Sequence, residues 1–128
     1  MANAFLERLA SGLLLADGAM GTELYADGIP FERNFDELNL TNAAVVQAVH
    51  RRYIAAGAEL ILTASFDANR SHMDRRGYTG RVRDANFQAA RIARDAREIA
   101  GVPVFIAGSV GPIGRDLAVG AWTIEDAY

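Results

Sequence analysis

The sequence predicts an α/β fold in which helices cover a parallel sheet. Three short apolar runs alternate with helical stretches, and each ends in a polar or glycine-rich turn; the runs are residues 13–16, 60–63 and 103–107. Strands that are apolar on both faces are typical of parallel sheets with helices packed on them. Both a doubly wound open sheet and a (β/α)8 barrel have this order of elements. A complete barrel takes about 250 residues, so three strands are less than half of one.

The helical stretches have capping residues or terminating glycines. We expect a helix at residues 4–11 ended by Gly12, one from Thr41 to Gly57, one from Thr79 to Gly101, and the start of another at Thr123. Apolar side chains recur on one face of the second and third helices. We expect a long loop at residues 25–40 and a polar segment at residues 65–76. Tyr53 and Phe87 are predicted to lie in the core.

The composition is that of one globular domain spanning residues 1–128. A net charge of −3 argues against a nucleic-acid partner or an anionic membrane surface, because either usually selects a basic patch. The chain has no cysteine, so it offers no disulfide and no thiolate ligand. The N-terminal region lacks the basic and apolar segments of a signal peptide, and its apolar run is too short to cross a bilayer. We therefore expect a cytoplasmic protein.

The turn after the first apolar run, Asp17-Gly18-Ala19, is the leading candidate for a ligand site. In both possible folds the active site lies at the carboxyl ends of the strands. A carboxylate there can bind the ammonium group of an α-amino acid, and backbone N–H groups beside glycine can bind its carboxylate. The alternative is that Asp17 only caps a turn and that the glycines serve tight backbone geometry.

The other two strand ends carry weaker signals. Residues 63–70 offer hydroxyl and amide groups, or form an ordinary connection. Residues 107–114 contain three glycines but match no phosphate-binding pattern, so close approach of a substrate to the backbone suits them better. No pair of His, Asp or Glu has metal-site spacing. His50 is expected to be structural, and His72 to be solvated in a polar loop.

Five segments, in order, resemble the homocysteine S-methyltransferases, a family that includes the homocysteine domain of cobalamin-dependent methionine synthase and the betaine-dependent enzymes. The segments are residues 14–24 (LLADGAMGTEL), 37–41 (ELNLT), 49–58 (with VH, Y and AGA), 63–69 (TASF and AN) and 106–112 (IAGSVGP). Together they extend over almost the whole chain.

This resemblance implies a (β/α)8 TIM barrel, of which the chain holds about the first three βα units as a truncated homocysteine-binding domain. It implies methyl transfer from a donor of the S-methylmethionine, betaine or methyl-folate type to the thiol of homocysteine, giving methionine. Asp17, Gly18 and Ala19 match the family's substrate-binding turn. The family's zinc is held by three cysteines from late strands, which are absent here. No metal ligand or catalytic residue is therefore assigned, and the chain alone is expected to be inactive.

The sequence alone leaves two points open. Thr63-Ala64-Ser65-Phe66 stands where the family usually has Thr-Asn-Thr-Phe, so Ala64 lacks an amide that could contact a ligand. A rival hypothesis makes the chain a non-catalytic half-barrel module or an inactive remnant. Its uncovered strand edge would then favour aggregation or a homo-oligomer.

Overall fold

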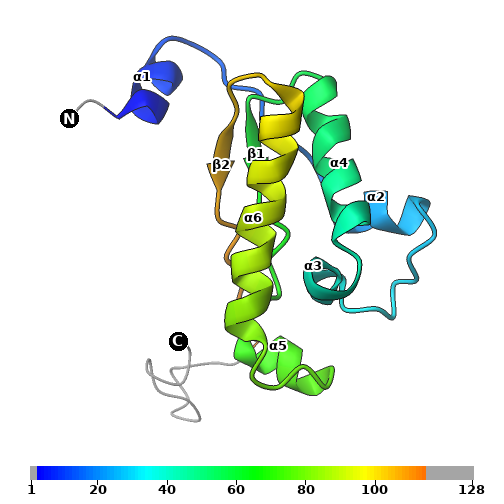
Figure 1. Ribbon diagram of the computed structural model, residues 1–128. Helices are drawn as coiled ribbons and strands as arrows, with labels where there is room; N and C mark the ends of the chain where they lie inside the picture. The colour runs from blue at the N-terminus through cyan, green and yellow to red at the C-terminus, as the bar shows by residue number, and fades with distance from the viewer. Residues whose placement is uncertain (1–2, 115–128) are drawn as a thin grey trace.

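The computed structural model describes residues 3–114, in which helices and strands alternate as an α/β arrangement (Figure 1). In order they are α1 (Ala4–Ala10), α2 (Gly21–Ala26), the 3-10 helix η1 (Phe35–Glu37), α3 (Leu38–Thr41), α4 (Ala43–Ala55), β1 (Leu60–Leu62), α5 (Arg70–Arg75), α6 (Val82–Ala100) and β2 (Phe105–Ala107). None of the helices in this part of the chain is long and apolar enough to cross a membrane. The helix expected from Thr123 lies outside the described residues.

The sheet is parallel, as predicted. β1 pairs with β2 with Leu60 opposite Phe105 and Leu62 opposite Ala107. On the other side of β1, the first apolar run contributes only one parallel bridge, between Ala16 and Leu60. The prediction of a full strand at residues 13–16 is therefore wrong. The last residues of this apolar run pair with the start of β1. Residues 13–14 therefore lie beyond the end of β1 at which that strand starts, and no strand runs beside them.

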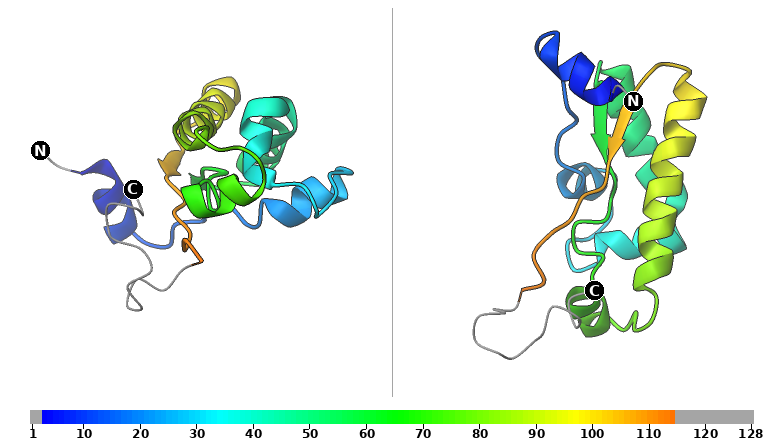
Figure 2. Two further views of the ribbon diagram at one scale, coloured as in Figure 1. Left: turned by 90° about the horizontal axis from the view of Figure 1, so that it is seen from below. Right: turned by 90° about the vertical axis from the view of Figure 1, so that its left-hand side faces the viewer.

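Helices α4 and α6 cover the same face of the sheet, as the right-hand view of Figure 2 shows. Small side chains on α6, including Ala93 and Ala96, are fully buried and allow close packing against Ile54 of α4 and Ile61 of β1. Three neighbouring segments that follow one another in sequence, with α4 and α6 on one face, are compatible with the start of a (β/α)8 barrel.

The starts of two helices differ from the prediction. Thr41 is the last residue of α3, and α4 begins after Asn42 without a side-chain cap. The Thr41 hydroxyl instead contacts the Glu37 carboxylate at 2.7 Å. Thr79 does not cap α6 either, because Gly80 has a φ of +77° and places a turn before the helix. The predicted helix ends are confirmed at Gly101 and at Gly57, which has a φ of +106°.

Short helices lie where loops were expected. The region 25–40 contains η1 and α3, and the region 65–76 contains α5. These helices are too short to show an apolar period, which is why periodicity missed them. The side chain of Asn69 caps α5 by accepting from the backbone N–H of His72 at 3.1 Å. Asn69 was thus the residue from which the start of this helix could have been predicted.

One core assignment is wrong. Phe87 is 64% exposed, because it lies two residues from the buried Ala85 and Ala89 and therefore on the other side of α6. Tyr53 is partly buried and packs against two core clusters, as expected.

Candidate active site

A pocket of about 370 Å³ lies at the carboxyl end of β1, the end that faces α3 and α5 in Figure 1. Four separate parts of the chain line it: residues 17–21, residues 35–36, residues 62–67, and Ser109 in the turn after β2. Barrel enzymes carry their active sites at this end of the strands. The pocket therefore brings residues of all three strand-end turns together and adds a loop that the sequence did not single out.

Asp17 lines this pocket from the turn after the Ala16 bridge. Its Oδ2 accepts a hydrogen bond from the backbone N–H of Leu62 at 3.0 Å, which ties the turn to β1. Its Oδ1 is buried and has no partner among the described residues. Burial raises the pKa of this carboxyl, and the Leu62 hydrogen bond opposes that rise. The carboxylate thus has one oxygen fixed by the fold and one left for a further donor.

Gly18 and Ala19 also line the pocket, and both are exposed. Neither backbone N–H donates to another residue in the described range. The Tyr53 hydroxyl donates to the Ala19 carbonyl at 2.7 Å and fixes the turn. A Cβ at Gly18 would lie 2.9 Å from that hydroxyl oxygen, so glycine is what allows Tyr53 to pack here. Two free N–H donors and one carboxylate are therefore held side by side.

Two acidic residues of the pocket were missed at the sequence level. Asp36 is 7% exposed, and Asp67 lies beside it in the same pocket. Burial, reinforced by repulsion from Asp67, raises the pKa of Asp36 to about 7. Asp36 directly precedes the motif at residues 37–41, but no residue spacing indicates that it meets the strand end. Only the folded loop brings the two carboxyls together.

A buried amide holds this loop against β1. The Asn39 Nδ2 of α3 donates to the Asp36 carbonyl at 2.8 Å and to the Ala64 carbonyl at 2.6 Å. The Ala64 side chain itself packs in the core with Leu24 and Val46. Position 64 thus contributes a backbone acceptor and an apolar contact.

Hydroxyl groups link the turns after β1 and β2. Ser65 donates to the Ser109 carbonyl at 2.8 Å, and the Ser109 N–H donates to the Thr63 hydroxyl at 2.9 Å. The Gly111 N–H donates to the Phe66 carbonyl at 3.0 Å. The sequence predicted that a substrate would approach the backbone closely at this turn. At Gly111 the close neighbour is instead the backbone of the chain itself, at Phe66.

Gly111→Ala is accordingly expected to destabilise the protein by about 1–3 kcal/mol, the usual range for overpacking. A Cβ at Gly111 would lie 2.3 Å from the Phe66 carbonyl oxygen, so the two turns must separate. Equilibrium urea unfolding measures the change. Gly108→Ala is the matched control, because a Cβ there meets no atom within 4 Å. Equal stability of the two variants would contradict the prediction.

The two histidines differ from each other. His50 is fully buried on α4, and neither ring nitrogen has a partner among the described residues. Burial lowers its pKa to about 4. This placement agrees with the prediction of a structural histidine. His72 lies in α5 and is half-buried, so the prediction of a solvated loop residue is wrong. Its Nδ1 lies 3.0 Å from Asn69 Oδ1, and its Nε2 lies 3.7 Å from Asp67 Oδ1.

The residues that the structure describes do not form a zinc site. Between residues 3 and 114, no three His, Cys, Asp or Glu side chains are grouped so that they could hold a metal ion. The whole sequence also contains no cysteine.

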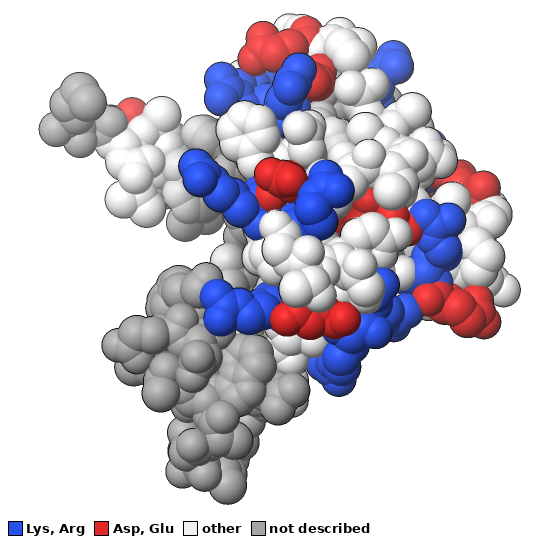
Figure 3. All heavy atoms as spheres, turned by 60° about the horizontal axis from the view of Figure 1, so that its bottom comes forward, with Lys and Arg blue, Asp and Glu red and all other residues white. Residues whose placement is uncertain are grey.

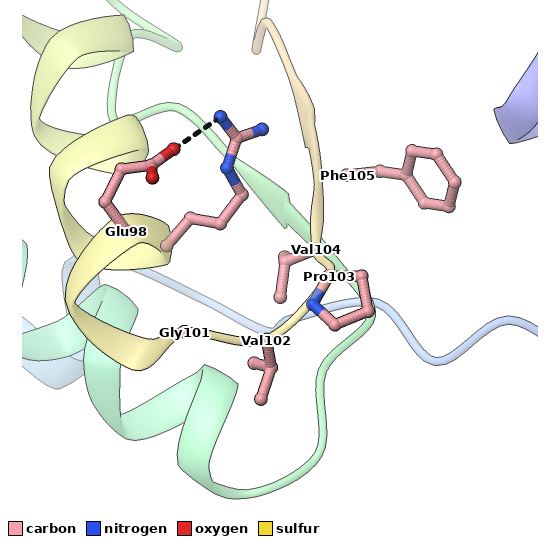
Figure 4. Close-up of a pocket in the computed structure, with 7 residues that line it drawn as sticks. Glu98, Gly101, Val102, Pro103, Val104 and Phe105 are labelled. Atoms are coloured by element: carbon pink, nitrogen blue, oxygen red, sulfur yellow. Dashed lines mark hydrogen bonds and ion pairs between the residues drawn. The ribbon is translucent and has the colours of Figure 1, made fainter.

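Another cavity, of about 520 Å³, lies at the opposite end of the sheet (Figure 4). It is formed by the turn from α6 into β2, residues 101–104, and by the ion pair between Arg97 and Glu98 at 3.1 Å. The Phe105 ring points away from it and contacts Phe5 of α1 edge-on. This end of a barrel sheet serves stability rather than chemistry.

Basic and acidic groups are interspersed on the face seen in Figure 3. This distribution agrees with the net charge of −3. A nucleic-acid surface would instead gather Arg and Lys in one stripe.

Comparison with known proteins is consistent with the geometry of the pocket. The homocysteine S-methyltransferase family model matches residues 14–128. The chain is 32% identical over 136 residues to methionine synthase from Mycobacterium tuberculosis, covering 96% of this chain and 11% of that protein. It is 36% identical over 118 residues to homocysteine S-methyltransferase from Escherichia coli, covering 85% of this chain and 38% of that protein.

Solved structures give the same result. The metallated form of the homocysteine methyltransferase MmuM from Escherichia coli superposes with a TM-score of 0.76 at 32% identity, covering 93% of this chain and 45% of that one. The oxidised form of MmuM gives the same TM-score, 0.76. The chain thus spans less than half the length of these relatives. The sequence, the pocket and the comparisons agree, and the chain belongs to the homocysteine S-methyltransferase family.

Proposed function

We propose that this chain is the first part of a (β/α)8 barrel domain that transfers a methyl group to the thiol of homocysteine, giving methionine. The observation that carries the proposal is the arrangement of Asp17 beside the free N–H groups of Gly18 and Ala19. The carboxylate would bind the substrate's ammonium group and the N–H groups its carboxylate. Family membership supports the choice of homocysteine among α-amino acids.

The proposed reaction is a direct transfer of the methyl group from the donor to homocysteine. The bond between the methyl carbon and the donor atom breaks, and its electron pair stays with the donor. A new S–CH3 bond forms on the homocysteine sulfur, and the thiol proton passes to solvent. The role of this chain is to hold the amino-acid end so that the sulfur reaches the donor.

A solved relative is described as a metallated form, which supports a metal in the complete domain. Residues 3–114 do not fit zinc and the sequence has no cysteine, so we place the metal-binding groups in other segments of the complete domain. The alternative of a non-catalytic half-barrel remains the competing hypothesis for the chain alone. A cytoplasmic location is also part of this proposal.

The pocket favours a cationic methyl donor. Its described lining contains the carboxylates of Asp17, Asp36 and Asp67 and the rings of Phe35 and Phe66, with no basic side chain. Carboxylates and aromatic faces attract a sulfonium or quaternary ammonium group. Methyl-folate carries an anionic glutamate tail, which these acids would repel.

The proposal is tested by methionine formation in the protein as its gene encodes it, supplied with homocysteine and each donor type in turn. Formation of methionine with an onium donor is the expected result. A gene product that binds homocysteine but transfers no methyl group would favour the non-catalytic module. Absence of homocysteine binding would remove the proposal.

Asp17→Asn is expected to raise the KM for homocysteine about 10-fold to 100-fold, the loss of one charge-assisted hydrogen bond. Asparagine keeps an oxygen for the Leu62 N–H, so the fold of the turn is preserved. Steady-state kinetics at varied homocysteine concentration measure the effect. Asp27→Asn is the control, because Asp27 pairs with Arg52 at 2.9 Å outside the pocket. An unchanged KM would remove Asp17 from substrate binding.

A further inference from the structure

The turn at residues 17–19 is anchored at both of its ends. At one end, the Asp17 Oδ2 accepts from the Leu62 N–H at 3.0 Å, which ties the turn to β1. At the other end, the hydroxyl of Tyr53, on α4, donates to the Ala19 carbonyl at 2.7 Å. The free N–H groups of Gly18 and Ala19 lie between these two anchors, so both anchors influence where these donors point.

The Tyr53 ring also packs directly against Gly18. A Cβ at Gly18 would lie 2.9 Å from the hydroxyl oxygen and 3.2 Å from the ring carbon Cε1. The φ of Gly18 is not in the left-handed region, so glycine is needed here for space rather than for an unusual backbone conformation. The ring itself is held in place because it packs against the two hydrophobic clusters that contain Val49 and Ile54.

The space made for the ring increases the freedom of the backbone. Glycine adopts a wide range of φ and ψ, so the peptide groups beside Gly18 could rotate easily. The carbonyl and the N–H of a trans peptide point in opposite directions, so such a rotation would present an oxygen where an N–H now points. It would also move the Ala19 carbonyl, which Tyr53 holds from outside the pocket. The Tyr53 hydrogen bond therefore opposes this rotation.

The surroundings of Tyr53 keep its hydroxyl protonated at neutral pH. Burial raises the pKa of Tyr53, and the negative charges of Glu23 and Asp17 raise it further, while Arg52 opposes them. A carbonyl oxygen can only accept a hydrogen bond, so a protonated phenol is the form that this contact requires.

We propose that Tyr53 is a positioning residue that sets the affinity of the pocket for the α-carboxylate of the substrate. The inference rests on the proposed function, in which the Gly18 and Ala19 N–H groups bind that carboxylate, and it assigns part of the recognition to a residue outside the pocket. Without the hydroxyl, the turn spends less time with both donors in place, and the apparent affinity falls with that fraction. The ammonium group is still bound, because β1 holds Asp17 independently.

Three thiols separate the two charged ends of the substrate. Homocysteine carries both, 4-sulfanylbutanoate keeps only the carboxylate, and 3-aminopropane-1-thiol keeps only the ammonium group. Tyr53→Phe is expected to raise the dissociation constants of homocysteine and 4-sulfanylbutanoate about 3-fold to 10-fold, the loss of one hydrogen bond. The dissociation constant of 3-aminopropane-1-thiol is expected to stay unchanged. Calorimetric titration of the protein as its gene encodes it measures all three.

Two further variants serve as references. Tyr25→Phe removes the same oxygen from a ring that is 54% exposed and stacks on Phe31 outside the pocket, so it is expected to bind all three thiols as wild type does. Asp17→Asn is expected to give the reverse pattern, weakening homocysteine and 3-aminopropane-1-thiol without weakening 4-sulfanylbutanoate. Tyr53→Phe itself keeps the ring and its packing in the core.

The outcomes distinguish the inference from the function on which it rests. Weaker binding confined to the two carboxylate-bearing thiols supports the role of Tyr53. Unchanged binding of homocysteine in Tyr53→Phe would overturn it, and so would equal weakening of all three thiols, which indicates a merely structural role. Binding of homocysteine without methyl transfer would remove the proposed function, whereas the same titrations would still decide the role of Tyr53. Absence of homocysteine binding to the wild type would remove both.

Discussion

Replacing Asp36 by asparagine is expected to stabilise the protein at pH 8 by about 2–4 kcal/mol. The carboxyl is 7% exposed, and burial together with Asp67 raises its pKa from 3.8 to about 7. A raised pKa means that the folded state favours the neutral form. Its contribution to stability is complete below pH 3.8 and is lost as the pH rises through about 7. Asparagine keeps the shape of the neutral acid without the charge.

Urea unfolding at pH 4 and pH 8 measures this effect. The variant and the wild type are expected to be similar at pH 4 and to diverge at pH 8. Asp95→Asn is the control, because Asp95 is an exposed acid on α6 and surface changes usually fall within about 0.5 kcal/mol. Equal stability of wild type and Asp36→Asn at pH 8 would show that the folded protein accommodates the charge.

A gain in stability at Asp36 would come with a loss of function. A buried acid that destabilises the fold at neutral pH is typical of a site shaped for a ligand. In the pocket at the carboxyl end of β1, the Asp36 charge would be compensated by a cationic donor. The same substitution is therefore expected to raise the KM of an onium donor, which a residue with only a structural role would not do.

The long elements of this fold could be predicted from the sequence because their signals are local. The alanine-rich face of α6 and the glycine after it, Gly101, gave the helix and its end. The rule that ligand sites lie at strand ends identified the turn at Asp17, and the pocket contains it. In each case one segment carries its own signal.

The remainder depends on contacts between distant segments. Asp36 meets Asp67 only because Asn39 ties the loop to the Ala64 carbonyl across 25 positions of sequence. The unsatisfied amide of Asn34 exists only in the folded loop. Likewise, the strand expected at residues 13–16 is shortened because of where β1 begins. Single-sequence periodicity reports none of these relations.

His50 is expected to make the protein sensitive to acid, by up to about 3 kcal/mol at pH 4. Its pKa is lowered from 6.5 to about 4 because it is fully buried on α4. A lowered pKa in a base means that the unfolded chain binds the proton more tightly. The contribution is therefore present above pH 6.5 and is lost as the pH falls towards 4. His50→Leu removes the titrating group and two unpartnered nitrogens, so stability at pH 7 should be equal or higher.

The two buried groups act in opposite directions over nearly the same pH range. As the pH falls from 7 to 4, protonation of Asp36 favours the folded state and protonation of His50 favours the unfolded state. Unfolding free energies measured across this range should then separate them. Relative to wild type, Asp36→Asn should lose stability on acidification, and His50→Leu should gain it. The double variant should follow the wild-type slope, because it has lost both opposing terms. If His50→Leu lost stability in acid as steeply as Asp36→Asn, the buried histidine would not be the source of acid sensitivity.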